Sequence, residues 1–284
     1  MNLKDIPMQR ISLSDAVSTR YLDTGGEGIP VLLIHGLAAS IEAWRDVVPL
    51  LSSKYRVIAL DLPGFGQADK PKDAAYTAVD FFLPMFTRFM DAIGVPSAHL
   101  VGSSMGASLA IRFAARHPDR VASVVAANPG GFASYIHPFL RAPTLPLLGK
   151  PMSRPMRATN AFALGLTVNN TAKRTAALLD EIDAFSKMPG AHNAFVKTLR
   201  GLTTPFGLKD LPEFEADAKA VQAPTLIVWG DKDRVFPVKQ MKAGQKVMPD
   251  AVFRTMQGVG HFPQIDAPEV FSRLTMSFLQ KVQS

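Results

Sequence analysis

One serine lies in a context that could make it a nucleophile. Ser104 stands between Gly102 and Gly106, after a short apolar run typical of a strand and before apolar residues spaced as in a helix. A tight turn from strand to helix lifts the middle side chain above the sheet edge, and small flanking residues let backbone pass close by. A hydroxyl placed in this way can attack a carbonyl carbon. The same small residues would also suit a turn that serves only packing, so both interpretations stay open at this point.

Strands and helices alternate on both sides of this turn. Apolar runs of strand length occupy residues 31–35, 56–60, 100–102, 121–126, 224–230 and 252–256. Helices are predicted at residues 41–51, 79–93, 238–248 and 268–282. This order indicates an α/β fold with a doubly wound, mostly parallel sheet, in which sites form beyond the carboxyl ends of the strands. His35, Asp61 and Ser104 all lie at such ends.

The alternation breaks between residues 131 and 211. Several prolines interrupt the first part of this segment, and helical patterns follow at 171–187 and 191–202. Residues 131–205 hold nine basic and three acidic side chains, so +6 of the net charge of +7 falls there. We expect an inserted, mainly helical cap at 131–211, which divides the remaining fold into a first part at 1–130 and a second part at 212–284.

Composition limits the classes of function. The chain has 284 residues, 47% of them hydrophobic, and no cysteine, so disulfides and thiolate chemistry are excluded. Neither a signal peptide nor a membrane-length apolar run is visible, which leads us to expect a soluble, cytoplasmic protein. The basic excess lacks interleaved aromatic residues and a nucleic-acid-binding motif, so we expect no nucleic-acid partner. We also expect no cofactor and no metal, because no ligand cluster is visible.

Five motifs in order resemble those of the α/β-hydrolase superfamily over essentially the whole chain outside the cap. They are His35-Gly36-Leu37, Asp61-x-Pro63-Gly64-x-Gly66, Gly102-x-Ser104-x-Gly106, Gly230-x-x-Asp233-x-x-x-Pro237 and Gly260-His261. The resemblance implies an eight-stranded sheet.

The resemblance also implies a catalytic triad and an oxyanion hole. Ser104 would be the nucleophile, His261 its base, and Asp233 the acid that orients the histidine, with Asp231 as the less favoured alternative. The backbone N–H groups of Leu37 and Met105 would stabilise the oxyanion. Asn128 stands where some members of the superfamily carry the acid, which argues against that variant.

Among activities of the superfamily, the sequence favours hydrolysis of carboxylic esters with apolar acyl groups through an acyl-enzyme on Ser104. Haloalkane dehalogenases and epoxide hydrolases carry aspartate at the position of Ser104 instead. One alternative is a carbon–carbon bond hydrolase of ring-cleavage products, although Leu37, Ala38 and Ala39 replace the further glycines usual there. The other is a non-catalytic ligand receptor with this fold.

One segment of the expected cap has a composition that could suit contact with a lipid surface as well as with the substrate. Residues 139–150 mix large apolar residues with the cations Arg141 and Lys150 and hold no acidic residue. We expect this segment to roof the acyl pocket, with weak contact to anionic lipid surfaces as a further hypothesis. The sequence leaves the oligomeric state open.

Overall fold

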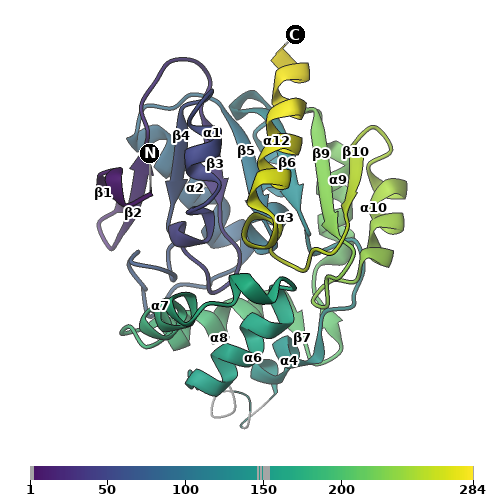
Figure 1. The fold of residues 1–284 in the computed structure, drawn as a ribbon. Coiled ribbons are helices and arrows are strands. Elements are labelled where there is room, and N and C mark those ends of the chain that lie inside the picture. The colour runs from purple at the N-terminus through teal and green to yellow at the C-terminus, as the bar shows by residue number, and fades with distance from the viewer. Residues whose placement is uncertain (1–2, 146, 148, 150–153, 284) are drawn as a thin grey trace.

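A computed structural model describes residues 3–145, 147, 149 and 154–283. Its centre is an eight-stranded sheet of order β1-β2-β4-β3-β5-β6-β9-β10 (Figure 1). The strands are β1 Met8–Ser14, β2 Val17–Asp23, β3 Val31–Ile34, β4 Val57–Leu60, β5 Ala98–Ser103, β6 Val121–Ala127, β9 Thr225–Gly230 and β10 Val252–Met256. Only β2 pairs antiparallel with its neighbours β1 and β4 in this sheet. The predicted eight-stranded, mostly parallel sheet is therefore confirmed.

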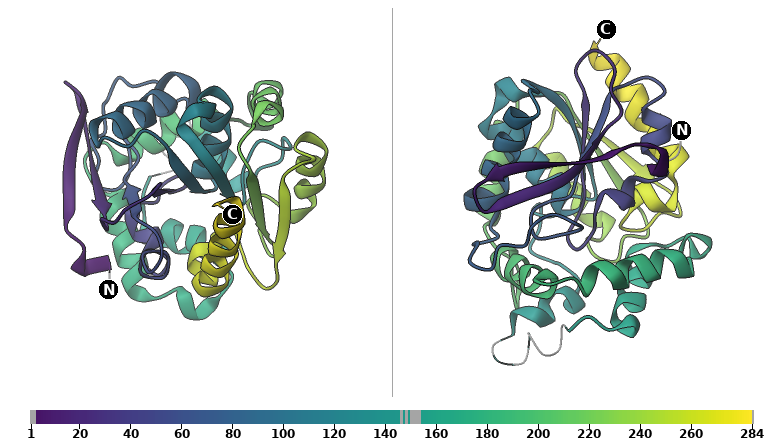
Figure 2. Two further views of the ribbon diagram at one scale, coloured as in Figure 1. Left: turned by 90° about the horizontal axis from the view of Figure 1, so that it is seen from above. Right: turned by 90° about the vertical axis from the view of Figure 1, so that its left-hand side faces the viewer.

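Helices cover both faces of the sheet, as the view from above shows (Figure 2). They are α1 Val48–Leu51, α2 Leu83–Ala92, α3 Met105–Arg116, α9 Leu211–Ala220, α10 Met241–Val247, α11 Pro263–Asp266 and α12 Pro268–Gln283. Neighbouring residues of β3 point to opposite sides: Leu32 and Ile34 join one core and Val31 and Leu33 the other. The centre of the sheet is thus buried on both faces, which explains why its central strands β3, β4, β6 and β9 are mainly apolar, whereas β1 and β10 at the edges are partly exposed.

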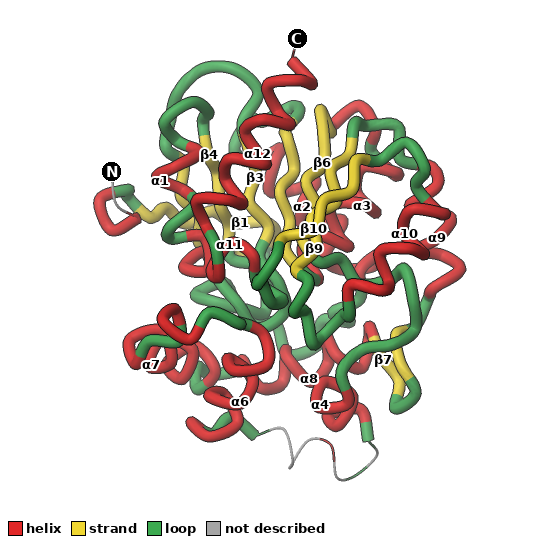
Figure 3. The backbone as a smooth tube through the Cα atoms, turned by 45° about the vertical axis from the view of Figure 1, so that its right-hand side comes forward, coloured by secondary structure: helices red, strands yellow, loops and turns green. Residues whose placement is uncertain are grey.

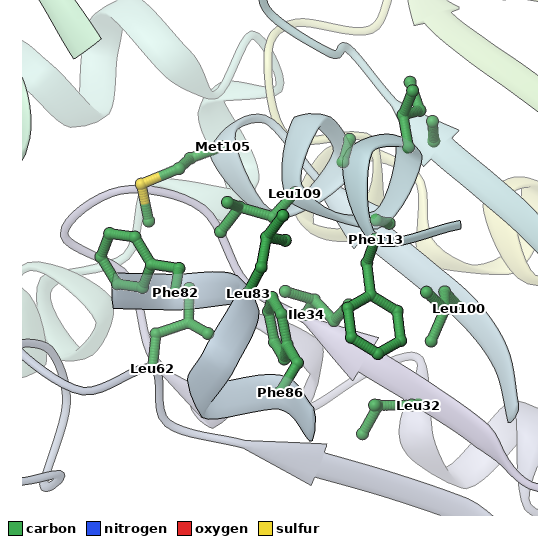
Figure 4. Packing of buried hydrophobic residues seen from close by; sticks show 14 of the residues in the cluster. Leu32, Ile34, Leu62, Phe82, Leu83, Phe86, Leu100, Met105, Leu109 and Phe113 are labelled. Carbon is green, nitrogen blue, oxygen red and sulfur yellow. The ribbon is translucent and has the colours of Figure 1, made fainter. Parts of the chain in front are cut away.

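The first of these cores lies under helices α2 and α3. Phe86 of α2 and Phe113 of α3 meet edge to face, with ring centroids 5.9 Å apart. Figure 4 shows the Phe113 ring beside Leu32 and Leu100 of the sheet and the Phe86 ring beside Ile34. This packing fixes α3 against β5, and Ser104 lies between these two elements.

The predicted helix at 41–51 is wrong as a continuous element. A 3₁₀ turn covers Ile41–Trp44, and α1 begins only at Val48. Pro49 cannot donate a backbone hydrogen bond to the carbonyl of Arg45, so a regular helix cannot continue through it. The turn and the helix still place Trp44, Val47 and Leu51 in the second core.

A helical cap covers the carboxyl edge of the sheet, at the lower end of the molecule in Figure 1. It contains α4 Pro138–Arg141, α6 Arg157–Thr167, α7 Ala176–Ser186, α8 Ala191–Leu202 and the short hairpin of β7 Thr203–Thr204 and β8 Gly207–Leu208. Figure 3 shows the same helices gathered below the strands. The sequence did not predict α6. Across the described ranges, none of the helices is long and apolar enough to span a membrane.

Candidate active site

The turn between β5 and α3 holds Ser104 in a strained conformation. Its φ is 55° and its ψ −119°, a region that costs a residue with a side chain about 1–3 kcal/mol. A Cβ on Gly102 would lie 2.3 Å from the carbonyl oxygen of Gly106, and one on Gly106 would lie 2.2 Å from that of Ile34. Both glycines are therefore required by close backbone approach, as the sequence pattern indicated.

The structure brings Ser104, His261 and Asp233 together in one buried chain of hydrogen bonds. His261 Nε2 lies 2.7 Å from Ser104 Oγ, and His261 Nδ1 lies 2.9 Å from Asp233 Oδ2. The three residues come from three loops that follow β5, β9 and β10. None is more than 7% exposed, so little water competes for these bonds. This is the arrangement that a nucleophile, a base and an orienting acid require.

Local hydrogen bonds explain why Asp233 rather than Asp231 faces the histidine. Asp233 Oδ1 accepts the N–H groups of Val235 and Phe236 at 2.8 and 2.9 Å, which leaves Oδ2 free for His261. Asp231 instead accepts the N–H of Val259 at 3.2 Å. Its carboxylate thus joins the loop after β9 to the loop after β10 and does not take part in the chain of hydrogen bonds.

Asn128 links the acid loop to the histidine loop. Its Oδ1 accepts the N–H of Gly230, and its Nδ2 donates to the carbonyls of Gly260 and His261 at 2.9 and 2.8 Å. An aspartate here would have no N–H groups to offer those carbonyls. The sequence showed that this position is not acidic, but it gave no sign of this bridging role.

Asp266 and the cap hold the histidine loop from the other side. The Asp266 carboxylate accepts the N–H groups of Gly260, Asn169 and Asn170 at 2.6–3.0 Å. The His261 N–H donates to the carbonyl of Thr167, the last residue of α6, at 2.7 Å. The contacts with Thr167, Asn169 and Asn170 join residues more than 90 positions apart, which no local sequence pattern reveals.

Leu37 and Met105, whose backbone N–H groups are expected to form the oxyanion hole, both lie close to the serine. Met105 is the first residue of α3, so its N–H has no partner within the helix. Leu37 follows Gly36, whose Cβ position lies 3.1 Å from Ser104 Cβ, and both Leu37 and Met105 line the cavity above the serine.

The model of the α/β hydrolase fold family matches residues 29–268 of this chain, which is most of its length. The chain belongs to the α/β-hydrolase family. Its expected family membership is thereby confirmed.

Curated relatives of the chain include two enzymes that are named as hydrolases of substituted hexadienoates. The chain is 31% identical to the 2-hydroxy-6-oxo-6-(2'-aminophenyl)hexa-2,4-dienoic acid hydrolase of Metapseudomonas resinovorans, covering 96% of this chain and 91% of that protein. It is 30% identical to the 2-hydroxy-6-oxo-6-phenylhexa-2,4-dienoate hydrolase of Burkholderia cepacia, covering 98% and 94%.

Solved α/β-hydrolase structures include both a lipid enzyme and a ring-cleavage enzyme. A bacterial membrane phospholipase A superposes with a TM-score of 0.83 at 28% identity, covering 98% of this chain and 87% of that one. A meta-cleavage product hydrolase from Pseudomonas fluorescens IP01 superposes with a TM-score of 0.82 at 28% identity, covering 98% and 99%. The name of the second structure thus matches the alternative that the sequence placed second, a carbon–carbon bond hydrolase of ring-cleavage products.

The sequence argument against a carbon–carbon bond hydrolase relied on the missing glycines after Gly36. The structure of this protein weakens that argument. Ala38 adopts a φ of 56°, the left-handed region in which glycine is the usual residue. The loop thus keeps the backbone shape that a glycine would favour, at a cost of about 1–2 kcal/mol. Its composition does not separate the two kinds of hydrolase.

A cavity of about 500 Å³ lies between the α/β-hydrolase core and the cap. Ser104 and His261 lie in its wall, and the cap contributes mainly apolar side chains, among them Leu140, Leu164 and Phe195. This volume suits a small organic substrate. Among the residues that the structure describes, no three His, Asp or Glu side chains lie close enough together to hold a metal ion.

His35 supports the loop that follows β3 and holds Leu37, and it does so as a neutral side chain. Its Nε2 accepts the N–H of Leu62 at 2.8 Å, and its Nδ1 lies 2.7 Å from the carbonyl of Gly36. Full burial lowers the pKa of His35, although the nearby carboxylate of Asp61 opposes the shift. Protonation would put a second N–H where Leu62 needs an acceptor.

The stability of the protein should therefore depend on pH through His35. Because its pKa is lowered in the folded state, its contribution is complete above about pH 6.5 and is lost as the pH falls towards the lowered value, by up to about 1.4 kcal/mol per pH unit. Urea unfolding of the His35→Gln variant, which keeps an acceptor but cannot titrate, should show a shallower loss below pH 6.5. His117→Gln is the control. An unchanged slope in His35→Gln would contradict this prediction.

Proposed function

We propose that this protein is a serine hydrolase that transfers an acyl group from its substrate to Ser104 and then to water. The observation that carries the proposal is the hydrogen-bonded chain from Asp233 through His261 to Ser104, which opens into the cavity. In this proposal residues 131–211 act as the cap that roofs the cavity, between core segments 1–130 and 212–284.

The reaction follows from the proposed roles of these groups. Ser104 Oγ attacks the carbonyl carbon while His261 Nε2 accepts the hydroxyl proton, and Asp233 stabilises the resulting imidazolium. The N–H groups of Leu37 and Met105 stabilise the oxyanion, each by about 2.7–4 kcal/mol. The proton passes from His261 to the leaving group, and a water molecule then hydrolyses the acyl-enzyme by the same steps.

The names of the relatives favour carbon–carbon bond hydrolysis as the first substrate class. In a dienoate of the kind named for the Burkholderia cepacia relative, the ketone beside the ring would accept the serine, and the leaving carbon would be protonated as a conjugated dienol. Such a substrate carries a carboxylate. Of the cations that line the cavity, Lys70 is held by the carbonyls of Gly66 and Ala68, which leaves its third N–H for an anion.

A second candidate is ester hydrolysis, and the charges of the cavity favour it. Arg112, another lining cation, already pairs with Asp217 at 3.2 Å and Glu213 at 3.6 Å. The rest of the cap lining is mainly apolar, which suits an uncharged acyl chain. The likeness to a phospholipase is compatible with this chemistry.

Turnover of two substrates by the purified protein separates these candidates. We expect Ser104-dependent hydrolysis of 2-hydroxy-6-oxo-6-phenylhexa-2,4-dienoate, followed as loss of the absorbance of the substrate, in which the dienol is conjugated with the phenyl ketone until the carbon–carbon bond breaks. We also expect Lys70→Met to raise KM for this anion by about tenfold, the loss of one charged contact, and to leave KM for neutral nitrophenyl esters unchanged.

Other results would identify other functions. A kcat/KM that is higher for nitrophenyl esters and increases with acyl chain length would make the protein an ester hydrolase. Tight binding of either compound without turnover would favour the receptor hypothesis.

A further inference from the structure

The most exposed large apolar side chains gather on the cap. Over the described part of the chain, those that are more than half exposed all lie between β6 and α9, and they are Leu147, Met156, Phe162 and Phe206. Phe206, at the tip of the β7–β8 hairpin, is 90% exposed. Single exposed apolar residues are ordinary, but several on one part of a fold indicate an interaction surface.

Helix α4 connects these side chains into one surface. The ring of Phe139 in α4 lies 5.0 Å from that of Phe162 in α6, and Arg141 donates to the carbonyl of Pro205, next to Phe206, at 3.3 Å. Figure 3 shows α4, α6 and β7 together at the lower end of the molecule. We call the surface formed by α4, Met156, Phe162 and Phe206 the cap edge.

Four cations in and beside the cap edge form no ion pair with a carboxylate of any residue that the structure describes. Arg141, Arg200 and Lys209 donate to the backbone carbonyls of Pro205, Pro143 and Arg200. Arg154 is exposed and forms no ion pair with any described residue. The sequence has no Asp or Glu at 131–179 or at 184–209, so nothing within those segments can neutralise this charge.

Apart from Asp210, which directly precedes α9, the acidic residues of the cap lie on α7 and are already paired. Asp180 and Asp183 contact Arg157, and Glu181 contacts Arg45 of the core. The positive charge of the cap is therefore uncompensated mainly at the cap edge, beside the exposed aromatic rings.

From this arrangement we propose that the cap edge binds the surface of an anionic lipid bilayer. Lys and Arg side chains would pair with lipid phosphates while Phe206 and Phe162 enter the interface between headgroups and acyl chains. A second copy of the chain fits less well, because a symmetric contact would place these unpaired cations against their own equivalents. The expected lipid contact thus includes Arg141, whereas Lys150, the other cation of that hypothesis, lies outside the described residues.

The cap edge also lies directly over the cavity. Phe139 and Leu140 of α4 line the cavity, while Arg141 reaches the hairpin. Bound lipid would therefore be separated from the cavity by little more than one short helix. The proposal concerns binding and holds whichever substrate class the protein hydrolyses.

Vesicle co-sedimentation tests the proposal with the full chain. We expect the protein to bind phosphatidylcholine vesicles that contain about a third phosphatidylglycerol at low salt, and to bind pure phosphatidylcholine at least tenfold more weakly. Arg154→Glu/Arg200→Glu should weaken binding to the anionic vesicles by about tenfold or more. Lys242→Glu/Lys246→Glu, the same charge change on α10, should leave it within about twofold.

The apolar contribution has its own pair of variants. Phe206→Ser should weaken binding to anionic vesicles by about tenfold, because one ring no longer inserts into the bilayer. Ile29→Ser, which changes an exposed apolar residue outside the cap, should leave binding unchanged. Absence of binding at low salt would overturn the proposal. An equal loss of binding in the Lys242→Glu/Lys246→Glu variant would also overturn it. So would a parent protein that forms dimers, which Phe206→Ser dissociates, and does not bind vesicles.

Discussion

Replacing Ser104 by alanine should lower kcat by roughly five to six orders of magnitude, to the rate that binding and the oxyanion hole alone can sustain. The substitution removes the Oγ atom that lies 2.7 Å from His261 Nε2, so no acyl-enzyme can form. The fold should persist, because alanine has the same steric cost as serine at a φ of 55°. Steady-state rates on whichever substrate the parent hydrolyses, with thermal unfolding alongside, measure both effects.

Ser103→Ala is the matched control for this experiment. Ser103 is also buried, but its Oγ donates to Gln264 Oε1 at 3.2 Å and does not contact His261. Its loss should cost about 1 kcal/mol of stability and leave kcat within about tenfold of the parent. If Ser103→Ala abolished activity while Ser104→Ala retained it, the assignment of the nucleophile would be wrong.

Asp233→Asn should lower kcat by about four orders of magnitude. The N–H groups of Val235 and Phe236 would hold the amide oxygen of the asparagine in the place of Oδ1. Its NH₂ group would then face His261 Nδ1 and force that nitrogen to accept. The proton of the neutral ring would move to Nε2, which could no longer accept a proton from Ser104.

Asp231→Asn tests whether this effect is specific. Asp231 accepts the N–H of Val259 in the histidine loop and pairs with Lys232, but its carboxylate does not bond the His261 ring, so we expect its loss to change kcat by less than about tenfold. The ratio of the two variants, measured with the same substrate and at several pH values, is the informative quantity. Equal losses would contradict the assignment of Asp233, and the reverse order would transfer the role to Asp231.

Much of the fold and the position of the candidate site could be predicted because their signals are local. The apolar strands and the glycines around Ser104 mark the sheet and the turn within a few residues. The helix at 41–51 could not be predicted correctly, since its hydrophobic spacing hid the effect of Pro49. The preference for esters over carbon–carbon bonds rested on missing glycines, and only the φ of Ala38 shows how little their absence means.

The supports of the site could not be predicted because they depend on contacts between distant segments. Asn128 bonds Gly230 and Gly260, more than 100 residues further along the chain. Asp266 bonds backbone N–H groups that any residue except proline would offer. Sequence patterns indicate which side chains can react, whereas these contacts, which decide where the side chains point, leave no pattern of their own.

The bond from His261 to the carbonyl of Thr167 has a consequence for how enzymes of this architecture can be recombined. A cap exchanged as a cassette between relatives would keep this support only if its backbone placed a carbonyl where that of Thr167 lies and N–H groups where those of Asn169 and Asn170 lie, which Asp266 requires. A cap with a different backbone path at these positions would release the histidine although every residue of the Ser104–His261–Asp233 chain remained. Grafts that keep residues 167–170 and replace the helices on either side avoid this damage, so new pockets are more accessible by altering α4, α7 and α8 than by exchanging the cap whole.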